Sequence, residues 1–139
     1  MSYDLMVFEE SVAPNKKDDF MLWYSEQVKW KEKHNYQDYS VTSKALQNWF
    51  MEMIETFPPM NGPLASDDDD DKITDYCIGK NVIYAAFAWS VQKEAYKKMR
   101  ELAAKHMVGF FDVSAENGEI LFPSTTDENN TVKPWWKIW

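Results

Sequence analysis

The chain has 139 residues, with 15 Lys and Arg residues against 23 Asp and Glu residues and a formal net charge of -8 at pH 7. This length is typical of one domain. Hydrophobic residues make up 45% of the chain and aromatic residues 16%, so a core can form without disulfides or metals and disorder of the whole chain is excluded. No apolar run reaches about 18 residues, so no membrane-spanning helix and no membrane partner are expected.

The acidic balance argues against binding to nucleic acid. Arg100 is the one arginine among the basic residues, whereas bidentate recognition of phosphate or guanine mostly uses arginine. The single cysteine, Cys77, cannot form an internal disulfide and fits a reducing cytosol. No basic region precedes an apolar stretch in residues 1–5, so we expect no signal peptide and a cytoplasmic location.

The first predicted elements are a strand and a helix. Residues 3–9 are β-prone and apolar on both faces, which predicts an interior strand. Residues 17–33 are expected to form a helix, because acidic residues occupy its first turn and a mostly aromatic stripe follows at helical spacing. The stripe consists of Phe20, Trp23, Tyr24, Gln27 and Trp30. Residues 34–41 lack a helical period and should form a connection.

The clearest amphipathic helix follows. Thr42 or Ser43 can cap it, and Pro58 and Pro59 end it near residue 57. Its apolar residues recur with almost unbroken spacing of three and four: Leu46, Trp49, Phe50, Met53, Ile54 and Phe57. Residues 58–72 are then expected to form a long loop, kept in solvent by five consecutive aspartates.

The second half of the chain predicts four elements and two hairpins. Strands are expected over 73–80 and 82–89, joined at a turn where Gly79 and Asn81 supply positive φ. A helix capped by Ser90 should run to about His106, and strands over 108–114 and 119–123 should flank a turn at 116–118. The strand–helix–strand run favours a right-handed crossover into parallel pairing.

The order of these elements, β-α-α-β-β-α-β-β, predicts a single α+β domain over residues 1–123. We expect a five-stranded mixed sheet with the helices mainly on one face. Residues 124–139 are expected to form a polar linker and a Trp-rich tail that ends in Trp135, Trp136 and Trp139.

Most chemical motifs are missing from the sequence. The aspartate run lacks the alternating ligands, central glycine and final glutamate of an EF-hand, and His34 and His106 lie too far apart to indicate a metal site. His106 is expected to interact with the C-terminus of its helix. Cys77 should be a buried, inert thiol. There is no Gly-x-Ser-x-Gly motif and no glycine-rich phosphate loop, so no catalytic residue, metal or cofactor is expected.

Asp112 is unusual because it lies within an otherwise apolar strand, where a carboxylate either faces solvent or needs a partner. Asp4 occupies a similar place in the first strand, and the two would share an acidic site if their strands were adjacent. Asp112 could instead be the polar group of an aromatic pocket formed by Trp49, Tyr84 and Trp89.

Three segments carry a resemblance to known proteins. Residues 2–8 (SYDLMVF), residues 50–63 (FMEMI and PPMNGP) and residues 102–113 (LAAKH and GFFDV) are similar to a family of small uncharacterised bacterial single-domain proteins. The resemblance covers about residues 2–123. It implies a bacterial cytosolic single domain, and the family has no established activity or catalytic residues to transfer.

Two functions remain open at this point. The first is a non-enzymatic, acidic protein-binding module, similar to an immunity or inhibitor protein, that recognises a basic protein. Its expected contacts are Asp67, Asp68, Asp69, Asp70, Asp71, Trp135, Trp136 and Trp139, and the tryptophans of the tail could alternatively join two copies of the chain. The second is a small-molecule-binding or enzymatic domain that uses the pocket around Asp112.

Overall fold

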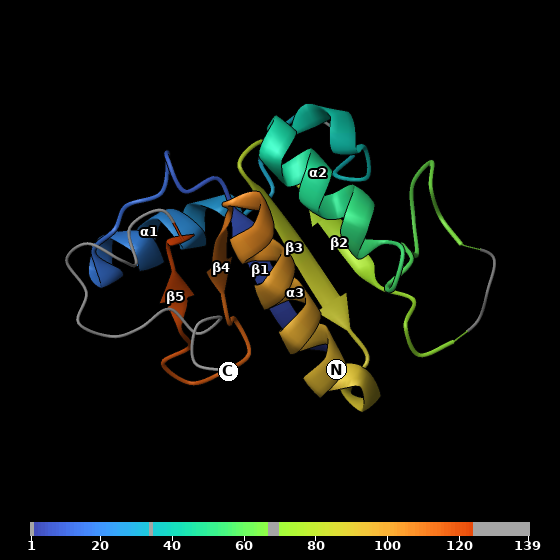
Figure 1. Ribbon diagram of the computed structural model, residues 1–139. Coiled ribbons are helices and arrows are strands. Elements are labelled where there is room, and N and C mark those ends of the chain that lie inside the picture. The colour runs from blue at the N-terminus through green and yellow to red at the C-terminus, as the bar shows by residue number, and fades with distance from the viewer. Residues whose placement is uncertain (1, 34, 67–69, 124–139) are drawn as a thin grey trace.

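The computed structural model describes residues 2–33, 35–66 and 70–123 (Figure 1). Its strands are β1 (Tyr3–Phe8), β2 (Asp75–Ile78), β3 (Val82–Phe87), β4 (Gly109–Phe111) and β5 (Ile120–Leu121). Its helices are α1 (Lys17–Gln27), α2 (Lys44–Met53) and α3 (Gln92–His106), with short 3-10 turns η1 (Tyr39–Val41) and η2 (Trp89–Val91). The predicted linker and tail, residues 124–139, lie outside the described residues.

The strands form one open sheet in the order β2-β3-β1-β4-β5. The α+β single domain is therefore confirmed, but the expected mixed sheet is wrong, because all four strand pairings in the described chain are antiparallel. The crossover through α3 does connect two strands that run in the same direction. β1 lies between them and pairs with both, so β3 and β4 never meet directly.

The sheet separates two apolar layers. Figure 1 shows α2 and α3 on the same face of the sheet. There they pack against the inward residues of β1, β3 and β4, and Trp49, Met53 and Met99 are fully buried. On the other face Phe20 of α1 packs against Phe8 and Phe111, with ring centroids 5.0 and 5.3 Å apart. Two of the three helices thus share a face, and α1 covers the opposite one.

Helix ends differ from the sequence prediction where local geometry decides them. α1 ends at Gln27 rather than residue 33, and Trp30 adopts a φ of 52° that no helix accommodates. Ser43 caps α2 as expected, since its Oγ accepts a hydrogen bond from the Leu46 N–H at 3.3 Å. α3 begins at Gln92, and the Ser90 hydroxyl donates to Asp71 instead of capping the helix.

The turns also differ in detail. The β2–β3 hairpin closes as expected, with the Gly79 N–H donating to the Val82 carbonyl at 2.8 Å, but neither Gly79 nor Asn81 has a positive φ. The turn before β5 does use a positive φ, which is 53° at Asn117. No helix in the described ranges is both long enough and apolar enough to cross a membrane.

Candidate binding surface

An open pocket of about 320 Å³ lies where the first turns of α3 meet the start of β1 and the end of β4. β1 contributes its first residue, α3 contributes one side of its N-terminal turns, and the chain leaving β4 contributes an acid. The lining residues are Tyr3, Gln92, Lys93, Tyr96 and Asp112. The pocket therefore joins segments that are far apart in the sequence.

Asp112 is the central acid of this pocket. The predicted strand over 108–114 is too long, because β4 ends at Phe111. Asp112 follows it directly and its N–H still donates to the Glu119 carbonyl at 3.0 Å, so the alternation of the strand continues and places Asp112 on the α3 side of the sheet, like Phe110. Its Oδ1 atom is buried and has no hydrogen-bond partner within the described part of the chain. Burial raises the pKa of the Asp112 carboxyl, and the charge of Glu119 raises it further, while the backbone N–H of Ala115 acts in the opposite direction.

The two tyrosines of the pocket are held in their neutral form. Burial, followed by the charge of Asp112, raises the pKa of Tyr3 far above its usual range. Burial and a hydrogen bond to Glu119 raise the pKa of Tyr96 to about 12, because the Tyr96 hydroxyl donates to the Glu119 carboxylate. Arg100 pairs with the other oxygen of Glu119 at 3.1 Å.

Glu119 is thus compensated by a cation, whereas Asp112 forms no ion pair with any described residue. Lys93 also lines the pocket and is exposed. The arrangement leaves one partly buried negative charge facing an open pocket with tyrosines on its walls. Such a charge destabilises the folded state, and ionisable groups with perturbed pKa values cluster at functional sites.

Trp89 lies beside the pocket. Its side chain is 45% exposed, and its ring centroid is 5.1 Å from that of Tyr3. Of the four residues predicted to form an aromatic pocket, only Asp112 and Trp89 lie at this surface. Trp49 is fully buried in the core beneath α2, so it cannot line an open pocket.

Tyr84 lies on the opposite side of the sheet, because it alternates along β3 with the core residues Ile83 and Ala85. Its hydroxyl donates to Asp4, which faces the same side. Asp4 and Asp112 therefore occupy opposite faces of the sheet and do not share a site, even though their strands are neighbours.

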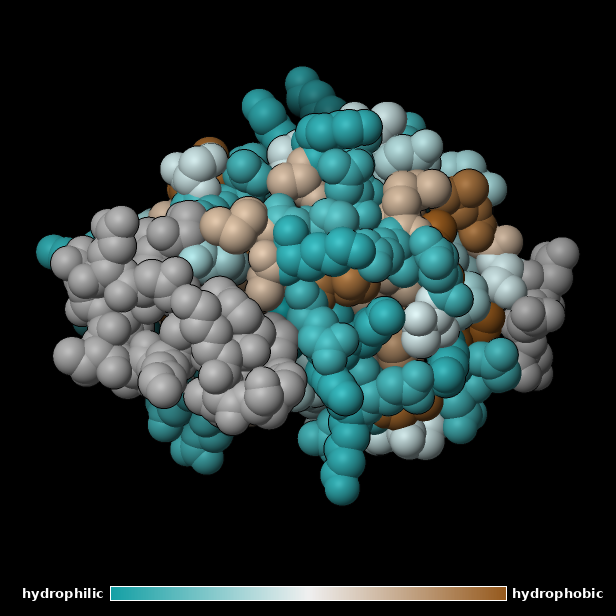
Figure 2. Space-filling view, viewed as in Figure 1, coloured by the Kyte–Doolittle hydropathy of each residue, from teal (hydrophilic) through white to brown (hydrophobic). Residues whose placement is uncertain are grey.

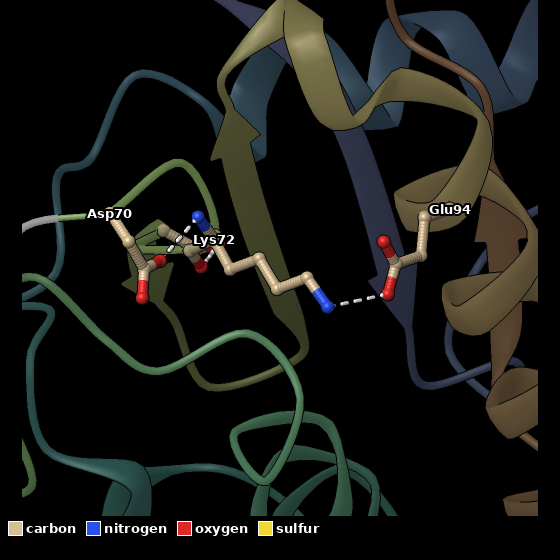
Figure 3. A network of polar contacts seen from close by, with 4 residues as sticks. Asp70, Lys72 and Glu94 are labelled. Carbon is tan, nitrogen blue, oxygen red and sulfur yellow. Dashed lines mark hydrogen bonds and ion pairs between the residues drawn. The ribbon is translucent and has the colours of Figure 1, made fainter.

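The acidic loop approaches α3 from its other side. Asp70 and Asp71 are exposed, and Asp71 accepts a hydrogen bond from Ser90 at 2.9 Å. Lys72, the next residue, forms an ion pair with Glu94 of α3 at 2.8 Å (Figure 3). These contacts hold Asp70 and Asp71 next to the start of α3. Asp67, Asp68 and Asp69 lie outside the described residues.

The base of this loop is fixed by backbone hydrogen bonds. The Met60 N–H donates to the Thr74 carbonyl at 2.8 Å, and the Thr74 N–H donates to the Pro58 carbonyl at 2.9 Å. From this base the loop extends away from the sheet and helices in Figure 1. Met60 and Leu64 on the loop are 51% and 39% exposed.

Neither His106 nor Cys77 belongs to a chemical site in the described part of the chain, and His34 lies outside the described residues. His106 and Lys105 both bind Glu52 of α2 at 2.9 Å, so His106 bridges two helices rather than only stabilising the end of its own. Cys77 is half-buried rather than buried as expected, because its neighbours Tyr76 and Ile78 take the core-facing positions of β2. Burial still raises the pKa of its thiol. Within residues 2–33, 35–66 and 70–123, no three His, Cys, Asp or Glu side chains are grouped so as to hold a metal ion.

Sequence reasoning missed Tyr3 and Tyr96. In the sequence Tyr3 is only the first residue of an apolar strand, and Tyr96 follows the buried Ala95 outside the apolar stripe of its helix. No local pattern links either residue to Asp112, because the packing of α3 on β1 brings them together. No protein-family model matches the chain, and no curated protein or solved structure matches it either.

Proposed function

We propose that this chain is a non-enzymatic binding protein that docks onto a basic protein. The docking surface, which we call the α3-start surface, consists of Asp70, Asp71, Trp89 and Asp112, and the nearly buried Tyr3 packs against Trp89. One observation supports this proposal most: three carboxylates and a half-exposed tryptophan lie around the first turns of a single helix.

Charge and aromatic area have separate roles in such a surface. The net charge of -8 attracts a basic protein over long range, and exposed carboxylates orient it during the encounter. The half-exposed ring of Trp89 then stabilises the complex, because large aromatic side chains at the centre of an interface contribute most of its affinity. Met60 and Leu64 on the neighbouring loop add apolar area at the edge.

The remainder of the visible face suits a localised contact. Figure 2 shows that the side covered by α2 and α3 is mostly hydrophilic, with only small and separate apolar patches. A large apolar interface of the obligate type would need more continuous apolar area. We place the protein and its partner in the cytosol, in keeping with a single cysteine that cannot form an internal disulfide.

A pull-down with matched charge variants tests this proposal. Asp70→Asn/Asp71→Asn removes two charges at the α3-start surface, and Asp18→Asn/Asp19→Asn removes two exposed charges from α1 on the opposite face. Both variants have the same net charge. We expect a basic protein from a lysate of the source organism to bind wild type and the α1 variant at low salt, and to bind the loop variant much less.

Equal loss of binding in both variants would mean that only total charge matters, and the docking surface would be wrong. Retention of no basic protein by the wild type at low salt would contradict the proposed function itself. Retention that persists at high salt in all variants would contradict its electrostatic basis.

The pocket at Asp112 supports a second candidate function, the binding of a free small molecule. The observation that favours it is an open cavity of about 320 Å³ with an uncompensated carboxylate. The volume of this cavity lies at the lower end of the usual range for ligand sites. The experiment below includes an arm that separates a free ligand from a protein side chain.

A further inference from the structure

We infer that the pocket formed by Tyr3, Gln92, Lys93, Tyr96 and Asp112 is a receptor for one organic cation, the guanidinium or ammonium group at the end of a long side chain. This inference rests on the proposed function, because it names the group that the basic partner inserts. It assigns Asp112 as the anion that pairs with the cation and the aromatic rings as the walls that enclose its aliphatic stem.

The charge of the pocket selects a cation. Asp112 is its uncompensated acid, whereas the nearby Glu119 is already paired with Arg100. A buried carboxylate oxygen without a partner costs free energy, and an entering N–H donor would satisfy it with a charge-assisted hydrogen bond. An anion would instead meet the negative charge of Asp112, since the guanidinium of Arg100 already pairs with Glu119.

The walls of the pocket select an organic cation rather than a metal ion. Tyr3 and Tyr96 are neutral phenols, but Tyr3 is only 4% exposed and the Arg100 guanidinium already lies 5.6 Å from the ring centroid of Tyr96. The half-exposed ring of Trp89, which packs against Tyr3, therefore supplies most of the accessible aromatic surface. Aromatic faces attract guanidinium and ammonium groups through their quadrupole, and they also cover the methylene stem of Arg or Lys. One carboxylate, one amide and two phenols, with the cationic Lys93 beside them, supply too few oxygen ligands for Ca²⁺ or Mg²⁺.

Lys93 provides an internal control on the sign of the binding. It is the one cationic side chain among the five lining residues, so it competes with an entering cation for Asp112. Removing its charge should strengthen the binding of a cation and weaken the binding of an anion. The response of Lys93→Gln therefore reports the charge of the true ligand independently of Asp112.

The experiment measures binding of an acetyl-Gly-Arg-Gly-amide peptide by two-dimensional NMR of the full chain. The matched control peptide replaces arginine with citrulline, which has nearly the same shape but a neutral urea group. Agmatine, a free guanidinium amine, forms a third arm. We expect the arginine peptide to shift the amide resonances of Gln92, Lys93 and Tyr96, and the citrulline peptide to leave them unchanged.

Variants locate the binding within the molecule. Asp112→Asn should lower the affinity for the arginine peptide about tenfold or more, since it removes a charge-assisted hydrogen bond. Glu116→Gln, an equal change of charge at an exposed position in the nearby turn, should leave the affinity within about twofold. Lys93→Gln should strengthen binding, and the amide spectrum of each variant shows whether it is folded.

Equal binding of the arginine and citrulline peptides, equal weakening by Asp112→Asn and Glu116→Gln, or weaker binding in Lys93→Gln would each overturn the inference. If agmatine binds and the arginine peptide does not, the cation site stands but its ligand is a free amine, which would contradict the role in partner docking. Binding of the peptide supports the protein side chain.

The two proposals can fail separately. If a basic protein binds through Asp70 and Asp71 while Asp112→Asn changes nothing, the docking proposal stands and the cation pocket is wrong. If no basic protein is captured while agmatine binds in an Asp112-dependent way, the pocket stands and the proposed function is wrong.

Discussion

At the scale of single residues, the carboxylate of Asp112 has the clearest energetic signature. Its pKa is raised above 3.8 in the folded protein, so the folded state binds a proton more readily than the unfolded state. The charge on Asp112 therefore destabilises the fold, beginning as pH rises through 3.8 and fully once pH exceeds the raised pKa. We expect Asp112→Asn to increase the free energy of unfolding at pH 7 by up to about 1 kcal/mol, since solvent screens a partly exposed group.

Urea denaturation of both proteins across a range of pH checks this expectation. The advantage of Asp112→Asn should shrink as pH falls towards 3.8, and Glu116→Gln should show no comparable gain. A variant that is less stable than wild type at pH 7 would show that the Asp112 charge is already compensated in the free protein.

Gly109 tests the packing of a single atom. A Cβ at Gly109 would lie 2.1 Å from Cε2 of Phe8, a ring that is fully buried between the sheet and α1. We expect Gly109→Ala to lower the free energy of unfolding by about 1–3 kcal/mol, because a filled core cannot accept an added methyl group. Thermal or urea unfolding measures the loss.

Gly79→Ala is the matched control, because its Cβ would lie 3.2 Å from the end of the Glu32 side chain and 3.4 Å from Cγ2 of Val82, and its φ is not positive. It should change stability by less than about 1 kcal/mol. Equal losses in the two variants would mean that glycine conformation, rather than contact with Phe8, determines the effect.

At the scale of elements, Glu52 of α2 joins two helices by binding Lys105 and His106 of α3. The hydrogen bond from Lys105, and then that from His106, lowers the pKa of the Glu52 carboxyl below 4.5. Its stabilising contribution is therefore present above pH 4.5 and is lost as pH falls through the lowered pKa. Glu52→Gln should lower the free energy of unfolding by less than about 1 kcal/mol at neutral pH. Urea unfolding at pH 7 and in acid should show that the difference in stability between wild type and variant disappears in acid.

Glu55→Gln, which changes an exposed acid that follows α2, is the control for net charge. If it reduced stability as much as Glu52→Gln, the link between α2 and α3 would contribute nothing specific.

Elements also show what the sequence could predict. Periodicity located β1, α2 and α3, because each has apolar residues at regular spacing and a physical end signal. Periodicity could not determine the strand pairing. Because β1 is apolar on both faces, its sequence is compatible with a place between β3 and β4 and also with a place beside only one of them. The prediction that Asp112 was unusual came from one strand, but Tyr3 and Tyr96 are brought to it only by the packing of α3 across the sheet.

At the scale of the whole molecule, the net charge of -8 determines how the proposed complex should respond to salt. The Debye length falls from about 30 Å at 0.01 M to about 8 Å at 0.15 M, so long-range attraction is screened over that interval. We expect the association rate constant with the basic partner to fall at least tenfold while the dissociation rate constant changes little. Surface plasmon resonance at several salt concentrations measures both constants.

Asp70→Asn/Asp71→Asn should flatten the salt dependence of association more than Asp18→Asn/Asp19→Asn, because only the former pair lies at the α3-start surface. An association rate constant that is independent of salt in the wild type would show that electrostatic attraction does not guide the encounter.

The central position of β1 also has a consequence for synthesis on the ribosome. β1 is the earliest strand in the chain, yet both of its partners, β3 and β4, are translated much later. Until residue 111 has emerged, the nascent chain exposes an apolar strand with at least one unpaired edge, which is a template for pairing with other chains. Chains that stall between α1 and α3 should therefore aggregate or recruit chaperones, whereas the finished chain encloses the same strand in the middle of its sheet.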